Sequence, residues 1–422
     1  MKKVLGLPAF RRLLAVSMMT ELALSVGTVA LAVLVYRRTG SAFGAVAFFL
    51  CAEFGPALVS PLFVSRFDGR AERIVLANIY VAEALIFALL AWIIGRFSLV
   101  AVLALVLVDG TLAVTARVLV RAAWTASTSR VGLMPEASAV VNAGYSVCFM
   151  VGPALGGAIV AAAGTRAALL VNVAAFGISA LTVATSPSIR RPSVDGHFME
   201  GRLRAAFAYA RAETVIRRLL SLQAVAMLFF TISIPVEVVF AQRTLHAGPG
   251  GYGVLLAVWG AGTIIGSGIY VRWRRLPYRV MVTVGTCLLG SGFLVMAVAP
   301  NLAVALVGAA IGGAGNGSQI VAVKTALQEA VQQRWLALVL SLNESMLQAV
   351  PGLGIVVGGA ITALAGTRIA LAAGAAGSLA AATLMWSRLP RRIQSTAAGR
   401  EAVDSSAASA DQAVTASSAG LT

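Results

Sequence analysis

The sequence predicts an all-α integral membrane protein with twelve transmembrane helices in two parallel six-helix repeats. Three observations support this fold class. The 422 residues are 59% hydrophobic and only 12% charged, which is too little polar surface for a water-soluble protein of this size. Apolar runs of about 20 residues, the length that crosses a bilayer, recur along most of the chain. Finally, the sequence of one segment in the first half is repeated in the second half.

Apolar runs between charged or turn-forming residues define twelve predicted spans. In chain order they are 13–36, 43–65, 74–95, 98–120, 138–162, 167–186, 219–241, 251–271, 279–299, 302–324, 335–363 and 367–387. The chain then divides into an N-terminal bundle (1–186), a basic linker (187–218), a C-terminal bundle (219–388) and an Ala- and Ser-rich tail (389–422). We expect the tail to be disordered, because it lacks hydrophobic periodicity.

The basic residues predict the orientation, since Lys and Arg are retained on the cytoplasmic side of a membrane protein. We therefore expect a multi-pass protein of the inner or plasma membrane with both termini, the linker and the tail in the cytoplasm. The net charge of +17 is then a consequence of topology, and nucleic-acid binding is not expected. With the N-terminus inside, the outer connections hold only these of the 33 basic residues: Arg37, Arg38, Arg96, Arg166, Arg243 and Arg368.

An internal repeat is the main architectural signal. Residues 156–170 read GGAIVAAAGTRAALL and residues 358–372 read GGAITALAGTRIALA, identical at eleven of fifteen positions with a constant offset of 202. The copies lie six spans apart, and because six is even, both halves have the same orientation in the membrane. Parallel repeats of this kind place the substrate site at their interface.

Twelve spans, parallel halves and a long basic central loop resemble the major facilitator superfamily of secondary transporters over residues 10–388. Span five contains Gly152-Pro153-Ala154-Leu155-Gly156-Gly157, which is similar to the Gly-Pro-x-x-Gly-Gly core of its drug:proton antiporters. Pro153 removes a backbone donor, and Gly152 and Gly156 allow a neighbouring helix to approach closely. We expect Gly152, Pro153, Gly156 and Gly157 to act in gating. The antiporter pattern has further glycines upstream, where this chain has Ala139 and Cys148.

The connection between spans two and three resembles a second landmark of the superfamily, although its acid is displaced by one position. The resemblance implies a cytoplasmic clamp of helix ends, and a purely topogenic basic loop is the alternative. The residues concerned are Arg66, Asp68, Gly69, Arg70 and Arg73. A softer resemblance to the macrolide-efflux and siderophore-exporter branch rests on the Gly-Pro-Ala-Leu-Gly-Gly core of span five together with Pro135, Glu136, Asn142, Gln328 and Glu329.

Ionisable residues inside the spans are the candidates for proton coupling, because a charge at a helix centre costs roughly 3 kcal/mol. Glu21 is the first of them. Ser17, Glu21, Ser25 and Thr28 follow at helical spacing, which places them on one face, and a polar face on an apolar helix must line a cavity. The superfamily's antiporters often have a functional acid in this helix. Ser17, Ser25 and Thr28 are therefore candidates for the substrate cavity.

Other spans contribute further candidates. Asp109 and Arg117 lie two turns apart in span four and can pair with each other or with Glu21. Glu53 precedes Gly55-Pro56 and either faces the cavity or caps a break in its helix. Glu237 follows Pro235 towards the outer end of span seven and is a candidate acid at the mouth of the pathway. Glu83 has the weakest case, because its helix shows little else that is polar. In the second half, we expect Asn316, Gln319 and Glu344 either to line the cavity or to serve close packing.

These patterns favour a proton-coupled exporter of a small amphipathic compound that works by alternating access. We expect a functional monomer in the lipid bilayer, driven by the proton gradient without a cofactor or metal. An uptake symporter on the same fold is the nearest alternative. A membrane enzyme is disfavoured because the loops are short and hold no acid pair, metal-ligand spacing or nucleophile–base set. A non-transporting receptor or scaffold would not require so many acids in the spans.

Overall fold

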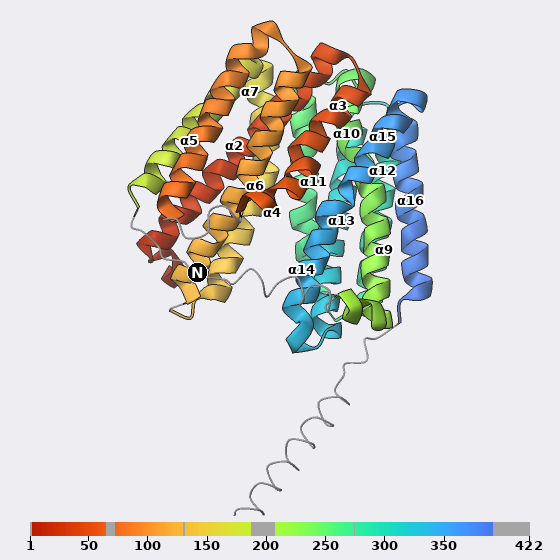
Figure 1. Ribbon diagram of the computed structural model, residues 1–422. Coiled ribbons are helices and arrows are strands. Elements are labelled where there is room, and N and C mark those ends of the chain that lie inside the picture. Colours follow the sequence, from red (N-terminus) through yellow and green to blue (C-terminus); the bar gives the residue numbers. More distant parts are fainter. Residues whose placement is uncertain (1, 65–71, 130, 187–206, 274, 391–422) are drawn as a thin grey trace, which may run out of the picture.

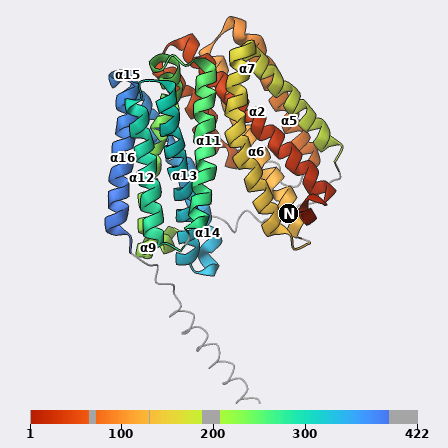
Figure 2. The same cartoon turned by 180° about the vertical axis from the view of Figure 1, so that it is seen from behind.

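The computed structural model describes residues 2–64, 72–129, 131–186, 207–273 and 275–390. Over these ranges the chain is almost entirely helical and contains no strand. The helices form two bundles that lie side by side (Figure 1), and the view from behind shows the same division (Figure 2). The prediction of an all-α fold is confirmed.

The first bundle contains the helices before residue 187. It begins with a short helix at the N-terminus, and two of its spans include a π-helical or 3₁₀ turn. Its elements are α1 (Lys2–Leu5), α2 (Pro8–Thr39), α3 (Ala42–Phe49), η1 (Leu50–Phe54), α4 (Gly55–Val64), α5 (Glu72–Ile93), η3 (Ile94–Arg96), α6 (Leu99–Ser129) and α7 (Met134–Ala184).

The second bundle begins at Thr214, five residues before the start that the apolar pattern predicts. Two of its spans are broken near a proline. Its elements are α9 (Thr214–Thr231), α10 (Ser233–Val239), η4 (Phe240–Thr244), α11 (Gly248–Arg272), α12 (Tyr278–Val298), α13 (Leu302–Ala330), α14 (Gln333–Ala349), α15 (Pro351–Ala365) and α16 (Thr367–Arg388).

The described residues contain eleven helical stretches that are long and apolar enough to cross a membrane. One of them, α7, is 51 residues long, or roughly 75 Å at the rise of an α-helix, far more than a hydrocarbon core of about 30 Å. It contains two spans, because Gly164 interrupts it with φ 81° and ψ 170°. The twelve predicted spans are therefore confirmed.

The same backbone conformation recurs at the equivalent point of the second half. Gly366 lies 202 residues after Gly164, at the repeat offset, and has φ 91° and ψ 167° between α15 and α16. This region of φ and ψ is accessible almost only to glycine. The repeat seen in the sequence is thus a repeat of structure, a glycine hinge that ends one span and begins the next.

The N-terminus and the end of α16 lie at the same end of the molecule, which we call the proximal end; the opposite end is the distal end (Figure 1). Three of the arginines assigned to the outer connections bind acceptors at the distal end. Arg368 donates to the carbonyls of Ala297 (2.8 Å), in the last turn of α12, and of Ala299 (2.7 Å), at its C-cap. Arg38 donates to Ile94 O, and Arg37 to Gln242 Oε1 (3.2 Å). A cation at a helix C-terminus is stabilising, which explains basic residues on this side.

The two bundles contact each other closely through glycines of α7 and α11. A Cβ atom added to Gly157 would lie 2.8 Å from Gly253 Cα and 2.8 Å from Pro249 O. A Cβ atom at Gly260, further along α11, would lie 2.9 Å from Met150 Cα. These helices therefore approach backbone to backbone from the distal end to the middle of the molecule, which requires residues without side chains.

Candidate functional site

A cavity of about 500 Å³ lies between the two bundles. The first bundle contributes walls from α2, the α3–η1 segment, α6 and α7, and the second from α9, α10, α11, α13, α14 and α15. Its lining is largely apolar and aromatic, with a few acids and one arginine. The polar and charged lining residues are Glu21, Ser25, Thr28, Glu53, Arg117, Ser233, Glu237 and Asn316.

The predicted polar face of α2 points toward this region. Glu21, Ser25 and Thr28 line the cavity itself. Ser17 lies one turn before Glu21 and lines a small adjoining hollow with it. The Ser17 hydroxyl, which is 4% exposed, donates to Leu13 O at 2.8 Å, so its donor is satisfied within the helix.

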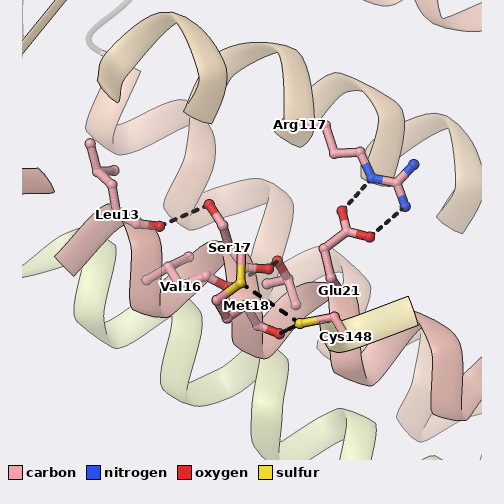
Figure 3. Close-up of polar contacts among 8 residues, drawn as sticks. Leu13, Val16, Ser17, Met18, Glu21, Arg117 and Cys148 are labelled. Carbon is pink, nitrogen blue, oxygen red and sulfur yellow. Dashed lines mark hydrogen bonds and ion pairs between the residues drawn. The ribbon is translucent and has the colours of Figure 1, made fainter. Parts of the chain in front are cut away.

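Glu21 and Arg117 form a bidentate ion pair that joins α2 to α6 (Figure 3). Arg117 Nε lies 2.5 Å from Glu21 Oε1, and Nη2 lies 3.0 Å from Oε2. The Arg117 side chain is 50% exposed and the Glu21 side chain is 18% exposed, so Arg117 borders the cavity while it is paired. Fork-to-fork geometry of this kind is the strongest arrangement for an arginine and a carboxylate. Of the two pairings that the sequence allowed for Arg117, the structure has the one with Glu21.

Asp109 lies two turns from Arg117 on α6 and is only 8% exposed. Its Oδ1 atom has no hydrogen-bond partner among the described residues. It lines a hollow of about 280 Å³ that also includes Thr28, Glu53 and Arg117. Asp109 is therefore separated from the ion pair but shares a hollow with its cation.

Glu53 and Glu237 face the cavity from opposite bundles. Glu53 lies in the π-helical turn Leu50–Phe54, just before Gly55-Pro56, and wide turns of this kind are frequent at functional sites. Glu237 lies in α10, two residues after Pro235, and is 8% exposed. Neither carboxyl forms an ion pair within the described part of the chain. The cavity thus holds two acids without a cation and one acid with a cation.

Aromatic rings form much of the apolar wall in the second bundle. Trp259 of α11 lies 5.8 Å from Phe230 and stacks at 5.3 Å on Phe293, measured between ring centroids. Phe230, Trp259 and Tyr252 line the cavity. Aromatic walls with a few polar groups are typical of sites that bind small organic molecules.

The Gly-Pro core of span five packs against both bundles. A Cβ atom at Gly152 would lie 2.5 Å from Ser25 Cβ, and one at Gly156 would lie 3.0 Å from Val26 Cα, both on α2. Gly157 faces Gly253 of α11, and Pro153 lines the cavity. This short segment therefore connects the polar helix α2, the cavity and the contact between bundles.

Cys148, where the antiporter pattern has glycine, also lies at the α2–α7 contact. Its Sγ atom lies 3.5 Å from Met18 O and 3.7 Å from Met18 Sδ (Figure 3). A slightly larger residue is thus accommodated by a flexible methionine on the facing helix.

The remaining candidates are distributed as follows. Asn316 lines the cavity. Gln319 is 6% exposed, and its backbone packs against Gly285 of α12, which agrees with the packing alternative. Glu344 is exposed on α14, and neither it nor Gln319 lines the cavity. Arg73 Nη1 donates to Ser186 O at 3.4 Å, which links the proximal ends of α5 and α7. Arg66, Asp68, Gly69 and Arg70 lie outside the described residues.

Glu83 of α5 had the weakest case in the sequence, but its position in the structure is unusual for an acid. It is 1% exposed, and neither carboxylate oxygen has a hydrogen-bond partner among the described residues. It lines the small hollow that also includes Glu21 and Arg117. The only signal in the sequence was a single acid in an otherwise apolar span. Among the described residues, no three His, Cys, Asp or Glu side chains gather so as to hold a metal ion.

Comparison with known families identifies the group of proteins to which this chain is similar. The family described as transmembrane secretion effector matches residues 5–415. The multidrug efflux pump Tap of Mycobacterium tuberculosis is 27% identical over 258 residues, which cover 57% of this chain and 61% of that pump. Tap of Mycobacterium bovis matches equally well. The matched region thus spans about three fifths of the length of these curated relatives.

Solved structures share the fold at low sequence identity. A bacterial homologue of the human lysosomal transporter Spinster, in an inward-facing conformation, has a TM-score of 0.71 at 13% identity and covers 90% of this chain and 97% of its own. The nucleoside transporter NupG has a TM-score of 0.68 at 14% identity and covers 90% and 99%. A D-xylose–proton symporter has a TM-score of 0.65 at 13% identity and covers 91% and 98%.

Proposed function

The chain belongs to the transmembrane secretion effector family of the major facilitator superfamily, and we propose that it is a proton-coupled exporter of a small amphipathic compound. As a member of this superfamily it is a membrane transporter. The export direction, the coupling ion and the class of cargo are parts of the proposal.

The observation that carries the proposal is the cavity between the two bundles. Both halves contribute walls, and the site of a parallel-repeat transporter lies at such an interface. Its aromatic lining suits an apolar body, while Ser25, Thr28 and Asn316 offer hydrogen bonds. The acids without a cation, Glu53 and Glu237, favour a compound with a positively charged group. An amphipathic compound meets all of these conditions.

Glu21 and Arg117 supply a way to couple protons to the cargo. Protonation of Glu21 removes the charge that holds Arg117, so the guanidinium, which borders the cavity, is released from α2. A cargo cation and a proton then compete for the same carboxylate. Two ligands that exclude each other at one site and reach it from opposite sides of the membrane are transported in opposite directions.

The Gly-Pro core of span five supports alternating access. It lies between α2 and the α7–α11 contact, so a movement of the ion pair on α2 can reach the surface where the two bundles meet. Similarity to the efflux pump Tap supports export. We place the protein in the plasma membrane as a monomer, with the proximal end in the cytoplasm and the proton gradient as its energy source.

The test is transport in inverted membrane vesicles with an imposed proton gradient. The fluorescent amphipathic cations ethidium and rhodamine 6G serve as probes, and Glu21→Gln is compared with wild type. Glu213→Gln is the matched control, because Glu213 is an exposed acid at the proximal start of α9.

We expect wild type and Glu213→Gln to accumulate probe until the gradient is collapsed, and Glu21→Gln to lose the gradient-driven part. Accumulation by Glu21→Gln at the wild-type level would remove Glu21 from coupling. Wild-type transport that is insensitive to a protonophore would end the proton-coupled proposal. Gradient-driven loss of probe from the vesicles would favour the uptake symporter.

A further inference from the structure

Glu83 lies inside the first bundle, behind the cavity wall. Its 1% exposure and the lack of a hydrogen-bond partner for either oxygen among the described residues are unusual for a carboxyl group. Burying an ionised carboxylate without partners is very costly, whereas the neutral acid avoids most of that cost. An ionisable residue within a membrane span is a functional-site hypothesis by default. The neutral form raises the question of where its proton goes.

A small hollow connects Glu83 to the ion pair. It has a volume of about 10 Å³, roughly the space that one water molecule needs. Glu21, Glu83 and Arg117 all line it, together with the hydroxyl-bearing residues Ser17, Thr20, Tyr80 and Tyr145. The hollow therefore provides a polar path between an unpaired acid and a paired one.

Arg117 is the shared element of this region. It lines the hollow of Glu83, the central cavity and the hollow that contains Asp109. Its guanidinium binds Glu21 in this structure, and half of its side chain remains exposed. A long flexible side chain on the same helix face as the hollow can change partners without movement of the backbone.

We propose that Glu83 is a proton-binding site that exchanges its proton with Glu21 when Arg117 changes partner. In the present state Arg117 pairs with the Glu21 carboxylate, and Glu83 is the neutral acid. When Arg117 turns to Glu83, one proton passes across the hollow from Glu83 to Glu21. Glu83 becomes the paired carboxylate, and Glu21 becomes a neutral acid at the cavity.

The exchange conserves both protons and charge. One arginine cation, one carboxylate and one neutral acid are present before and after it, so the low-dielectric interior never holds an extra charge. The titratable groups around Glu83 are Tyr80 on its own helix, Glu21 on α2, Asp109 and Arg117 on α6, and Tyr145 on α7. This inference rests on the proposed proton coupling and names the group that stores the proton.

The direct test is infrared spectroscopy of the purified full-length protein in lipid nanodiscs. The C=O stretch of a protonated carboxyl is recorded at neutral pH in H₂O and D₂O, where exposed acids are ionised. Wild type should show a band that Glu83→Gln lacks and Glu213→Gln retains. Glu21→Gln should also lose the Glu83 band, because Arg117 without its partner turns to Glu83. A spectrum that Glu83→Gln leaves unchanged would overturn the proposal, as would a Glu83 band that persists in Glu21→Gln.

Transport separates this inference from the proposed function. In the vesicle assay, Glu83→Gln should lose gradient-driven accumulation of ethidium but still let the probe equilibrate down its own gradient. If wild type carries neither probe, the proposed function fails, while the infrared result still reports on Glu83. If wild type is gradient-driven and Glu83→Gln is equally so, only the role of Glu83 is refuted.

Discussion

The contact between α7 and α11 offers a perturbation whose size can be worked out from the structure. A Cβ atom added at Gly253 would lie 2.8 Å from Gly157 Cα, whereas ordinary contacts begin at 3.4 Å. It would also press against the carbonyl oxygen of Pro153, a backbone atom that cannot rotate away. In Gly253→Ala the two helices must therefore separate by about 0.6 Å or more at this point, the difference between these distances.

Overpacking of this kind typically costs about 1–3 kcal/mol. The cost falls only on the conformation in which the distal ends of the bundles meet, because the contact is absent once they separate. A difference of about 1–3 kcal/mol changes the ratio of two conformations by roughly 5- to 150-fold. Gly253→Ala should therefore shift the population from the distal-closed to the distal-open conformation. Alanine also raises helix propensity by about 1 kcal/mol, but it does so equally in both conformations.

The assay is pulsed electron paramagnetic resonance between spin labels at Arg96 and Pro300. Both are exposed at the distal end, one on each bundle. The labels are introduced after Cys51, Cys148 and Cys287 have been replaced by serine. Gly253→Ala should move the distance distribution toward longer values.

The matched control is Gly268→Ala on the same helix. An added Cβ atom there meets nothing within 4 Å, so its distribution should equal that of the parent. If Gly253→Ala folds and leaves the distribution unchanged, the α7–α11 contact does not hold the distal end closed, and the reasoning is refuted.

Three further predictions concern the ion pair, the hinge and the aromatic wall. Arg117→Lys keeps the charge but loses the bidentate geometry with Glu21. Because hydrogen bonds to charged groups contribute about 1.5–3 kcal/mol, gradient-driven transport should fall about tenfold or more. Transport at the wild-type rate would contradict this prediction. Gly366→Ala should destabilise the protein by about 1–3 kcal/mol, because residue 366 has a φ of 91° that strains a residue with a side chain. Stability is measured by thermal unfolding in detergent, with Gly177→Ala as the control variant. Equal stabilities of the two variants would disprove the prediction. Trp259→Ala should weaken probe binding several-fold, because an aromatic contact between the indole ring and the ring system of the probe contributes about 0.5–1.5 kcal/mol. An unchanged Kd in a fluorescence titration would exclude Trp259 from the site.

The architecture could be predicted because the bilayer imposes a simple rule on the sequence. Each span needs a long apolar run, and duplication leaves the same residues at a fixed offset. Even the hinge at Gly164 was encoded in the repeated Gly-Thr-Arg, although its conformation was not.

The site was only partly predictable, because pairing between helices depends on rotation and depth. The spacing of Ser17, Glu21, Ser25 and Thr28 defines a face of one helix, and local periodicity is enough for that. The choice of Glu21 over Asp109 as the partner of Arg117 depends on how α2 and α6 pack, which no local pattern encodes. Glu83 was ranked lowest for the same reason, since its neighbours come from α2 and α6.

The central claim is that proton and cargo move in opposite directions through the cavity between the bundles. Proteoliposomes that contain purified protein, ethidium and a trapped pH-sensitive dye test this claim directly, with no gradient other than that of ethidium. Efflux of ethidium down its gradient should acidify the lumen of liposomes with wild-type protein, and it should not do so with Glu21→Gln. Alkalinisation of the lumen, or ethidium efflux without any pH change, would contradict proton-coupled export.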